Sequence, residues 1–235
     1  MGSNSHLKRL NMPRSWPLSR KTTTWIVRPL PGGHPLDMGM PLGPILRDVL
    51  GVAQTMREVR VVLSTGQIKV DGRVVKETRR IVGLMDVLTV GEQNYRCILD
   101  LNGRLRYRPI KDVDSSWKIG RIDGKVTIRG GMTQYRLHDG RNLLHESASE
   151  FSVGDSVVIS IPEQEVLEHL PFSEDGSTRA YIIGGSHAGE TALIQQRIIK
   201  RSSQPNEVNF EDFGTHARHV MVISDSRTLP IEVTT

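Results

Sequence analysis

Short runs of apolar and β-branched residues, each closed by a turn sequence, dominate the chain from Ile81 onward. The turn sequences are "LNGR", "IDGK", "HDGR" and "VGDS", and the runs between them include "YRCILDL", "RLRYRPI", "WKIGRI", "KVTIRG" and "SVVISI". Runs of this length, bounded by Gly, Asn and Asp, are typical of strands joined by tight turns. We therefore predict a β-rich region from about residue 95 to 175. A second set of strands, expected to number five after the "EDGS" break, suits a small barrel.

A helix and a hairpin are predicted in the stretch "TMREVRVVLSTGQIKVDGRVVK", residues 55–76. Thr55 and Glu58 form a capping box of the type T-x-x-E, and Gly66 suits the end of the helix. Asp71-Gly72 supplies the positive φ angles of a type I′ hairpin turn. The stretch is basic, because it carries five cations against two anions.

The predicted helix has one apolar and one cationic face. Met56, Val59 and Val62 or Leu63 fall on the inner face, so Arg57 and Arg60 point outward. A shorter helix is expected just upstream in "GPILRDVLG", residues 43–51, because Pro suits its first position and Gly its end.

The first forty residues show no helical or alternating period. "HLKRLNMPRSWPLSRKTTTW" mixes cations with Trp16, Trp25 and two prolines, and residues 29–44 hold nine Pro or Gly in sixteen positions. Such sequences sustain neither a helix nor a strand ladder. We predict an extended arm that orders only on a partner, followed by a loop or linker.

The charge is unevenly distributed along the chain. Residues 1–82 carry 14 Lys and Arg against 5 Asp and Glu, a net charge of +9, whereas residues 83–235 carry 17 against 21, a net charge of −4. Residues 1–36 hold six cations and no acid. This asymmetry is typical of a basic end that contacts a polyanion, and a solvated tail is the alternative.

Several classes of protein are disfavoured. No apolar run is long enough to span a bilayer, so no membrane partner is predicted, and no apolar segment follows the N-terminal charges as in a signal peptide. Cys97 is the single cysteine, which excludes internal disulfides and Cys₂His₂ or Cys₄ zinc sites and fits a reducing, cytoplasmic setting. His216 and His219 are weak evidence for a metal. We predict no metal, no cofactor and no small-molecule substrate.

Two motifs bear on catalysis. "GGSHAG", residues 184–189, lacks the Lys-Ser/Thr of a P-loop and fits a strand-to-strand turn. "YRLHDGRNLL", residues 135–144, is similar to the R-L-D motif of pseudouridine synthases, but His138 interrupts it. A hairpin turn over residues 138–141 is favoured. The rival hypothesis is an RNA-modifying enzyme with Asp139 as its nucleophile.

The order of motifs carries a resemblance to a known family. Two short helices, a hairpin and "GLMDVL" look like the alpha-L RNA-binding module of bacterial ribosomal protein four. "HLKR" and "P-x-x-W" (Pro13–Trp16) precede the module, and "HDGR", "VGD" and "GGSHAG" follow it. This succession closely resembles the small-subunit ribosomal protein four family of the archaeal and eukaryotic (e) type, and the length favours its archaeal branch.

The resemblance implies an α+β, mainly β fold in four parts. These are a basic extended N-terminal arm and linker (1–42), an alpha-L RNA-binding domain (43–94), a central β-rich domain (95–175) and a C-terminal KOW barrel resembling an SH3 fold (176–235). The KOW signature fits at Gly184, Gly185 and Gly189, whereas a further expected glycine is Ala192 here. The implied protein is a non-catalytic constituent of the small ribosomal subunit that supports translation.

The implied partners are small-subunit ribosomal RNA and neighbouring ribosomal proteins, and cations presented to phosphates would make the RNA contacts. The predicted RNA-binding residues are Lys8, Arg9, Arg14, Trp16, Arg20, Lys21, Arg57, Arg60, Lys69, Arg73, Lys76, Arg79 and Arg80. Trp16 either stacks on a base or anchors the arm onto the protein itself. A free RNA-binding regulator is the second rival.

Overall fold

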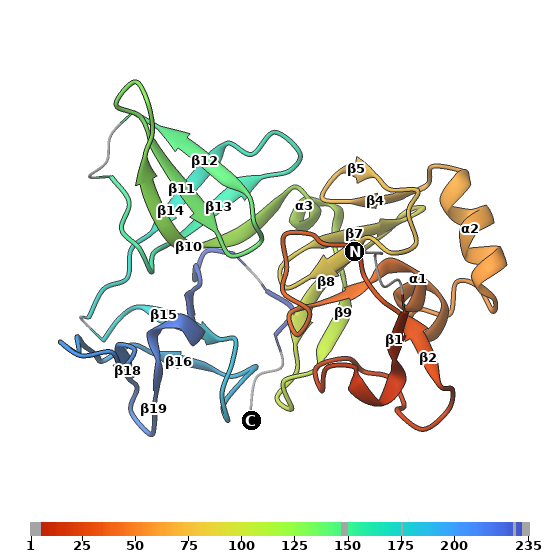
Figure 1. Ribbon diagram of the computed structural model, residues 1–235. Helices are drawn as coiled ribbons and strands as arrows, with labels where there is room; N and C mark the ends of the chain where they lie inside the picture. The colour runs from red at the N-terminus through yellow and green to blue at the C-terminus, as the bar shows by residue number, and fades with distance from the viewer. Residues whose placement is uncertain (1–5, 147–149, 175, 228, 232–235) are drawn as a thin grey trace. The chain divides into compact units, whose positions relative to one another are not determined.

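Short strands are the main regular secondary structure of this protein (Figure 1). Its computed structural model describes residues 6–146, 150–174, 176–227 and 229–231. The chain divides into two compact units. The first comprises the described residues of Met1–Ile98 and Arg104–Ser115, and the second those of Leu99–Gly103 and Ser116–Thr235. Within the described ranges, no helix has the length and apolar character needed to cross a membrane.

The main sheet of the first unit has five strands in the order β5-β4-β7-β8-β9. Their bounds are β4 Ile68–Val70, β5 Arg73–Val74, β7 Val87–Val90, β8 Gln93–Leu99 and β9 Leu105–Ile110, and the short helix α3 (Asp112–Ser115) follows. The predicted domain boundary at residues 94 and 95 therefore falls inside β8. The structure differs from the prediction because the sheet that holds the hairpin continues to the end of β9.

The predicted capping box is present at the start of α2 (Met56–Ser64). Thr55 Oγ1 accepts a hydrogen bond from Glu58 N at 3.3 Å, and Glu58 Oε2 accepts one from Gln54 N at 2.8 Å. Val59 and Leu63 are buried, which agrees with the predicted inner face. The helix therefore begins and faces the core as its sequence predicts.

The predicted hairpin is also present, between β4 and β5. Asp71 and Gly72 have φ angles of +48° and +74°, as a type I′ turn requires. Upstream, the single helix expected over residues 43–51 is instead a turn of α1 (Leu42–Pro44) followed by a π-helical segment, η2 (Ile45–Val49). Its side chains Ile45 and Leu46 are fully buried.

The N-terminal segment is a packed part of the first unit. β1 (His6–Lys8) pairs with β2 (Trp25–Val27), and the 3-10 turn η1 (Arg9–Asn11) lies between them. These elements lie beside α1 (Figure 1). Met12, Trp16 and Ile26 are buried. The prediction of an extended arm that orders only on a partner is therefore wrong for the described residues. A few apolar side chains without any period are enough to anchor the segment.

The Pro- and Gly-rich linker is ordered by specific contacts. β3 (Gly39–Pro41) pairs with β6 (Ile81–Gly83). Trp16 Nε1 donates a hydrogen bond to the carbonyl oxygen of Gly39 at 2.9 Å. The buried ring of His34 lies with Nε2 2.9 Å from Asp86 Oδ2. The linker therefore closes over the same core as the "GLMDVL" motif.

A second five-stranded sheet, in the order β12-β11-β10-β13-β14, lies in the second unit. Its strands are β10 Trp117–Thr127, β11 Thr133–Leu137, β12 Asn142–His145, β13 Ser156–Ser160 and β14 Val166–Leu170. Its core consists of Ile122, Tyr135, Leu137, Leu143, Phe151, Val157 and Ile159. The "HDGR" sequence forms the predicted hairpin turn between β11 and β12.

One predicted turn of this sheet is wrong. Asp123-Gly124, in "IDGK", lies inside β10, where the pairing with β11 shifts register between Ile122 and Gly124. β10 pairs with β11 on one side and with β13 on the other. These ladders extend the strand through a local turn signal and leave a bulge in its place.

The C-terminal strands form two three-stranded sheets, β16-β15-β20 and β17-β18-β19. Six strands therefore lie in the described part of this region where five were expected, and the predicted division near residue 175 lies between β14 and β15. The elements are β15 Arg179–Ile182, β16 Thr191–Leu193, β17 Gln196–Ile198, β18 Glu207–Asn209, β19 Gly214–His216, η3 Ala217–His219 and β20 Val220–Val222.

The "GGSHAG" sequence forms the predicted turn between β15 and β16. Ala192 lies in β16 opposite Ala180, beyond the turn, so this departure from the family signature does not disturb the turn geometry. The close approach occurs at Gly189, which has a φ of +94° and where a Cβ would overlap the carbonyl oxygen of Asp100. Glycine is required there, and alanine is accommodated in the strand.

Candidate nucleic-acid interface

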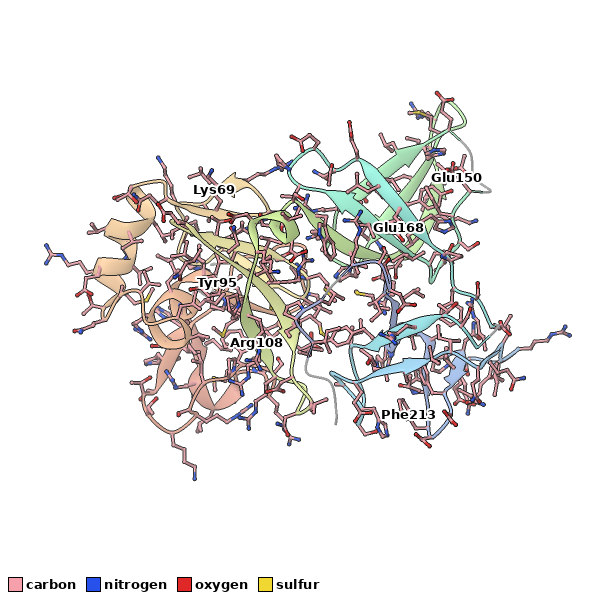
Figure 2. The ribbon with its side chains drawn as sticks, turned by 180° about the vertical axis from the view of Figure 1, so that it is seen from behind. Lys69, Tyr95, Arg108, Glu150, Glu168 and Phe213 are labelled. Atoms are coloured by element: carbon pink, nitrogen blue, oxygen red, sulfur yellow. The ribbon has the colours of Figure 1, made fainter. Side chains whose placement is uncertain are left out.

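The first unit presents a row of exposed cations along α2, the β4–β5 hairpin and the segment after it. None of them forms an ion pair with a carboxylate within the part of the chain that the structure describes. Lys69 is labelled on β4 in Figure 2. These cations, which we call the S-face, are Arg57, Arg60, Lys69, Arg73, Lys76 and Arg80.

The acid of the same helix, Glu58, is hydrogen-bonded at the start of the helix. Glu58 is held at the helix start, where hydrogen bonds from Gln54 N and the Thr55 hydroxyl lower its pKa below the ordinary value for a glutamate. The carboxylate therefore stays ionised at the positive end of the helix. It does not neutralise Arg57 or Arg60, whose guanidinium groups remain exposed to solvent.

The predicted N-terminal cations fall into two groups. Lys8, Arg14 and Lys21 are exposed. Arg9 is buried, and its guanidinium donates to Ser19 O at 2.6 Å. An RNA contact by Arg9 is therefore not supported by the structure, since its hydrogen-bonding groups hold the segment together.

Two further predicted cations bond to the backbone. Arg20 Nη1 donates to Leu10 O at 2.9 Å, and Arg79 Nε donates to Arg28 O at 3.1 Å. Both side chains are half-buried. Trp16, with an exposed fraction of 2%, has no ring face available to a base, which supports the second of its two predicted roles, that of an anchor.

Three arginines, two on the edge strand β9 and one directly before it, are absent from the predicted set. Arg104 and Arg106 are exposed and Arg108 is half-buried, whereas Leu105 and Tyr107 between them are buried. Figure 2 labels Arg108 on this strand. The alternation in "RLRYRPI" is the signal that could have identified them, because alternate residues of a strand share one face.

The carboxylate of the rival enzymatic hypothesis is held inside the second unit. Asp139 is buried, with Oδ2 lying 2.6 Å from Lys118 Nζ and 3.1 Å from Arg141 Nε. Lys118 is itself fully buried. The "HDGR" motif therefore fixes a turn onto the neighbouring strand β10, and its acid is a structural ion-pair partner.

The other candidate for chemistry is Cys97, which is also buried. Burial, followed by the nearby charge of Asp86, raises the pKa of its thiol well above the ordinary value. The thiol is therefore protonated near neutral pH and is a poor nucleophile. Within the described residues, no group of three or more His, Cys, Asp or Glu side chains is arranged to hold a metal ion.

Comparison with known families accounts for the order of these elements. Residues 1–37 match the RS4NT (NUC023) domain, residues 46–88 match the S4 domain, and residues 91–166 match the Ribosomal family S4e. The S4 match contains α2, the β4–β5 hairpin and all six cations of the S-face. The Trp16 anchor lies within the RS4NT match.

Whole-chain relatives extend this likeness. The chain is 44% identical over 213 residues to small ribosomal subunit protein eS4 of Methanothermobacter thermautotrophicus. The alignment covers 90% of this chain and 86% of that protein. It is 40% identical over 242 residues to the eS4 protein of Methanocaldococcus jannaschii, with 97% of both chains covered.

The fold of the chain is also similar to that of a solved S4e structure. The crystal structure of the 30S ribosomal protein S4e from Thermoplasma acidophilum is 31% identical and superposes with a TM-score of 0.70. The superposition covers 80% of this chain and 96% of that one. With its three domains matched in order and its relatives aligned over most of their length, the chain belongs to the eS4 family of small ribosomal subunit proteins.

Proposed function

We propose that this chain is a structural constituent of the small ribosomal subunit, where it binds small-subunit ribosomal RNA and supports translation in the cytoplasm. The observation that carries this proposal is the S-face. Its cations are exposed, they lack carboxylate partners among the described residues, and all six lie within the S4 domain match. The relatives named above are proteins of the small ribosomal subunit.

The chemistry of the S-face fits a folded RNA. Ribosomal RNA is a dense array of phosphates, and cations on rigid elements neutralise such an array while fixing the orientation of the protein. Arg57 and Arg60 lie nearly one turn apart on α2, and Lys69 and Arg73 come from paired strands of the hairpin. Double-helical RNA is recognised mainly by shape and backbone, so a cationic surface of this kind suits it.

The rival enzymatic function is not favoured. Asp139 is bonded to two cations inside the protein, so we propose a non-catalytic role for the chain. A uridine-isomerisation assay on RNA tests this point. We expect the wild-type protein and Asp139→Asn to give the same background signal, whereas activity that the variant loses would support the enzyme.

Cofractionation on a sucrose gradient tests the main proposal. At moderate salt, the protein should travel with small ribosomal subunits, together with the neighbouring ribosomal proteins that we expect as further partners. A free RNA-binding regulator would instead remain mostly near the top of the gradient. That distribution at native expression level would overturn the ribosomal assignment.

A further inference from the structure

A pocket lined by arginines lies in the second unit, in the half of the chain that is acidic overall. Residues 83–235 carry a net charge of −4, yet this pocket of about 540 Å³ is lined by four arginines and one acid. Its volume lies within the roughly 300–1,000 Å³ range of sites for small ligands. We call this cavity the arginine pocket. Its arginines are Arg121, Arg136, Arg197 and Arg218, and its acid is Asp123.

The acid of the pocket is already neutralised. Arg121 Nε and Nη2 lie 2.8 and 2.7 Å from Asp123 Oδ1. Arg121 Nη1 also donates to the backbone carbonyl of Arg218. This pair therefore forms a fixed wall of the pocket and cancels its own charge. The three remaining arginines have no carboxylate partner among the described residues.

Each remaining arginine reaches the pocket from a different element. Arg136 lies on β11 and Arg218 on η3, and both are exposed. Arg197, on β17, lies with Cζ 5.3 Å from the centre of the Phe172 ring, and its Nε is buried without a hydrogen-bond partner in the described protein. A buried donor that bonds to nothing is costly, so this guanidinium is suited to an acceptor that enters the pocket.

The histidine that lines the pocket, His219, contributes no charge to it. His219 Nε2 lies 3.3 Å from Arg218 Nε, which donates to it. Burial, followed by the charge of Arg218, lowers the pKa of this imidazole. The ring is therefore neutral at physiological pH, and the net positive charge of the pocket comes from its guanidinium groups.

We propose that Arg136, Arg197 and Arg218 form a binding site for a backbone phosphate of RNA, separate in sequence from the S-face. Guanidinium groups bind phosphate oxygens through paired hydrogen bonds, and three of them converging on one pocket suit a phosphodiester. The inference rests on the proposed function, since the RNA is small-subunit ribosomal RNA. The second unit thereby contributes an RNA contact of its own.

Salt titration of binding to small-subunit ribosomal RNA tests the site, using Arg136→Gln combined with Arg218→Gln. The control is Arg129→Gln combined with Arg201→Gln, which removes the same charge from exposed positions outside the pocket. Each lost phosphate contact removes roughly 0.7–0.9 from the slope of log affinity against log salt. Because the three arginines share one phosphate, we expect the pocket variant to lose about 0.7–0.9 from this slope and the control to keep the wild-type value.

A direct probe identifies the anion. Arginine Nε–H signals are followed by NMR during titration with inorganic phosphate or with a short RNA that lacks terminal phosphates. We expect the Arg197 signal to shift with the RNA, and the shift to disappear in the pocket variant. A shift with inorganic phosphate and none with the RNA would overturn the assignment to a backbone phosphate. Unchanged melting of the pocket variant establishes that its fold is intact.

Failure of this inference can be distinguished from failure of the proposed function. If wild-type protein does not bind the RNA, the proposed function is wrong. If wild-type protein binds and the pocket variant binds with the same slope, the pocket is not an RNA site and the S-face proposal stands. If the pocket variant melts early, Arg136→Lys with Arg218→Lys takes its place. This variant keeps the charge and should bind more weakly with an unchanged slope, and unchanged affinity would count against the site.

Discussion

Gly72 shows how one residue fixes the geometry of the β4–β5 hairpin. Its φ of +74° is a conformation that β-branched side chains rarely adopt. Gly72→Val should therefore destabilise the first unit by about 1–3 kcal/mol, measured by chemical denaturation. Arg73→Val is the matched control, because Arg73 is an exposed residue of β5 where a β-branched side chain fits. Equal stability of the two variants would contradict the type I′ turn.

Asp139 is a residue on which the second unit depends. Replacing it with alanine leaves the fully buried Lys118 without its partner at 2.6 Å. Removing one partner of a buried ion pair typically costs about 3–5 kcal/mol, so Asp139→Ala should unfold at much lower denaturant concentration. Asp139→Asn keeps the shape and should lose less. An alanine variant as stable as wild type would mean that the ion pair contributes nothing.

The helix α2 has a buried apolar face and an exposed cationic face, which we propose as an RNA-binding face. Val59 and Leu63 are buried, whereas Arg57 and Arg60 are exposed. Arg57→Glu combined with Arg60→Glu should leave the melting temperature nearly unchanged, because exposed positions tolerate substitution. Binding to small-subunit ribosomal RNA should weaken strongly, since two attractive charges become repulsive. Arg129→Glu with Arg201→Glu is the charge-matched control, and equal RNA affinity of the two pairs would show that the S-face is only a solvated surface.

A local turn signal predicted the structure correctly only where the pairing of the surrounding strands allows a turn. Asp71-Gly72 and Asp123-Gly124 are the same dipeptide, and both predict a turn. The first lies at the end of a short hairpin and forms the turn, whereas the second lies in a strand paired on both sides and becomes a bulge. Strand pairing between distant segments decides such cases, and a single sequence does not reveal it.

The candidate sites differ in the same way. The S-face was predictable because one helix and one hairpin carry most of its cations close together in sequence. The arginine pocket was not, because β10, β11, β17 and η3 bring its arginines together from distant positions. The N-terminal segment was misjudged for a related reason. Its buried Met12, Trp16 and Ile26 follow no period, so only the folded chain shows that they belong to the core.

At the scale of the whole molecule, the two compact units should respond separately to damage in one of them. Trp16 is buried in the first unit and bonds to the linker, so Trp16→Ala should cost that unit about 3–5 kcal/mol. Hydrogen exchange should accelerate in β3 and β6, while β10 and β13 of the second unit keep wild-type protection. Equal acceleration in both units would show that the chain unfolds as a single cooperative body.

The N-terminal segment combines a structural anchor with exposed charge, and the two roles can be separated in the full chain. Substituting Lys8, Arg14 and Lys21 with glutamine removes exposed cations and leaves Trp16 and Arg9 in place. We expect the melting temperature to stay near that of wild type. If each cation contacts a phosphate, the slope of log affinity against log salt should fall by about 2.1–2.7, since each contact contributes roughly 0.7–0.9. The control replaces Arg9 alone, which should lower stability, because its guanidinium holds Ser19 and Thr23. A triple variant with the wild-type slope would mean that this segment serves the fold and makes no contact with RNA.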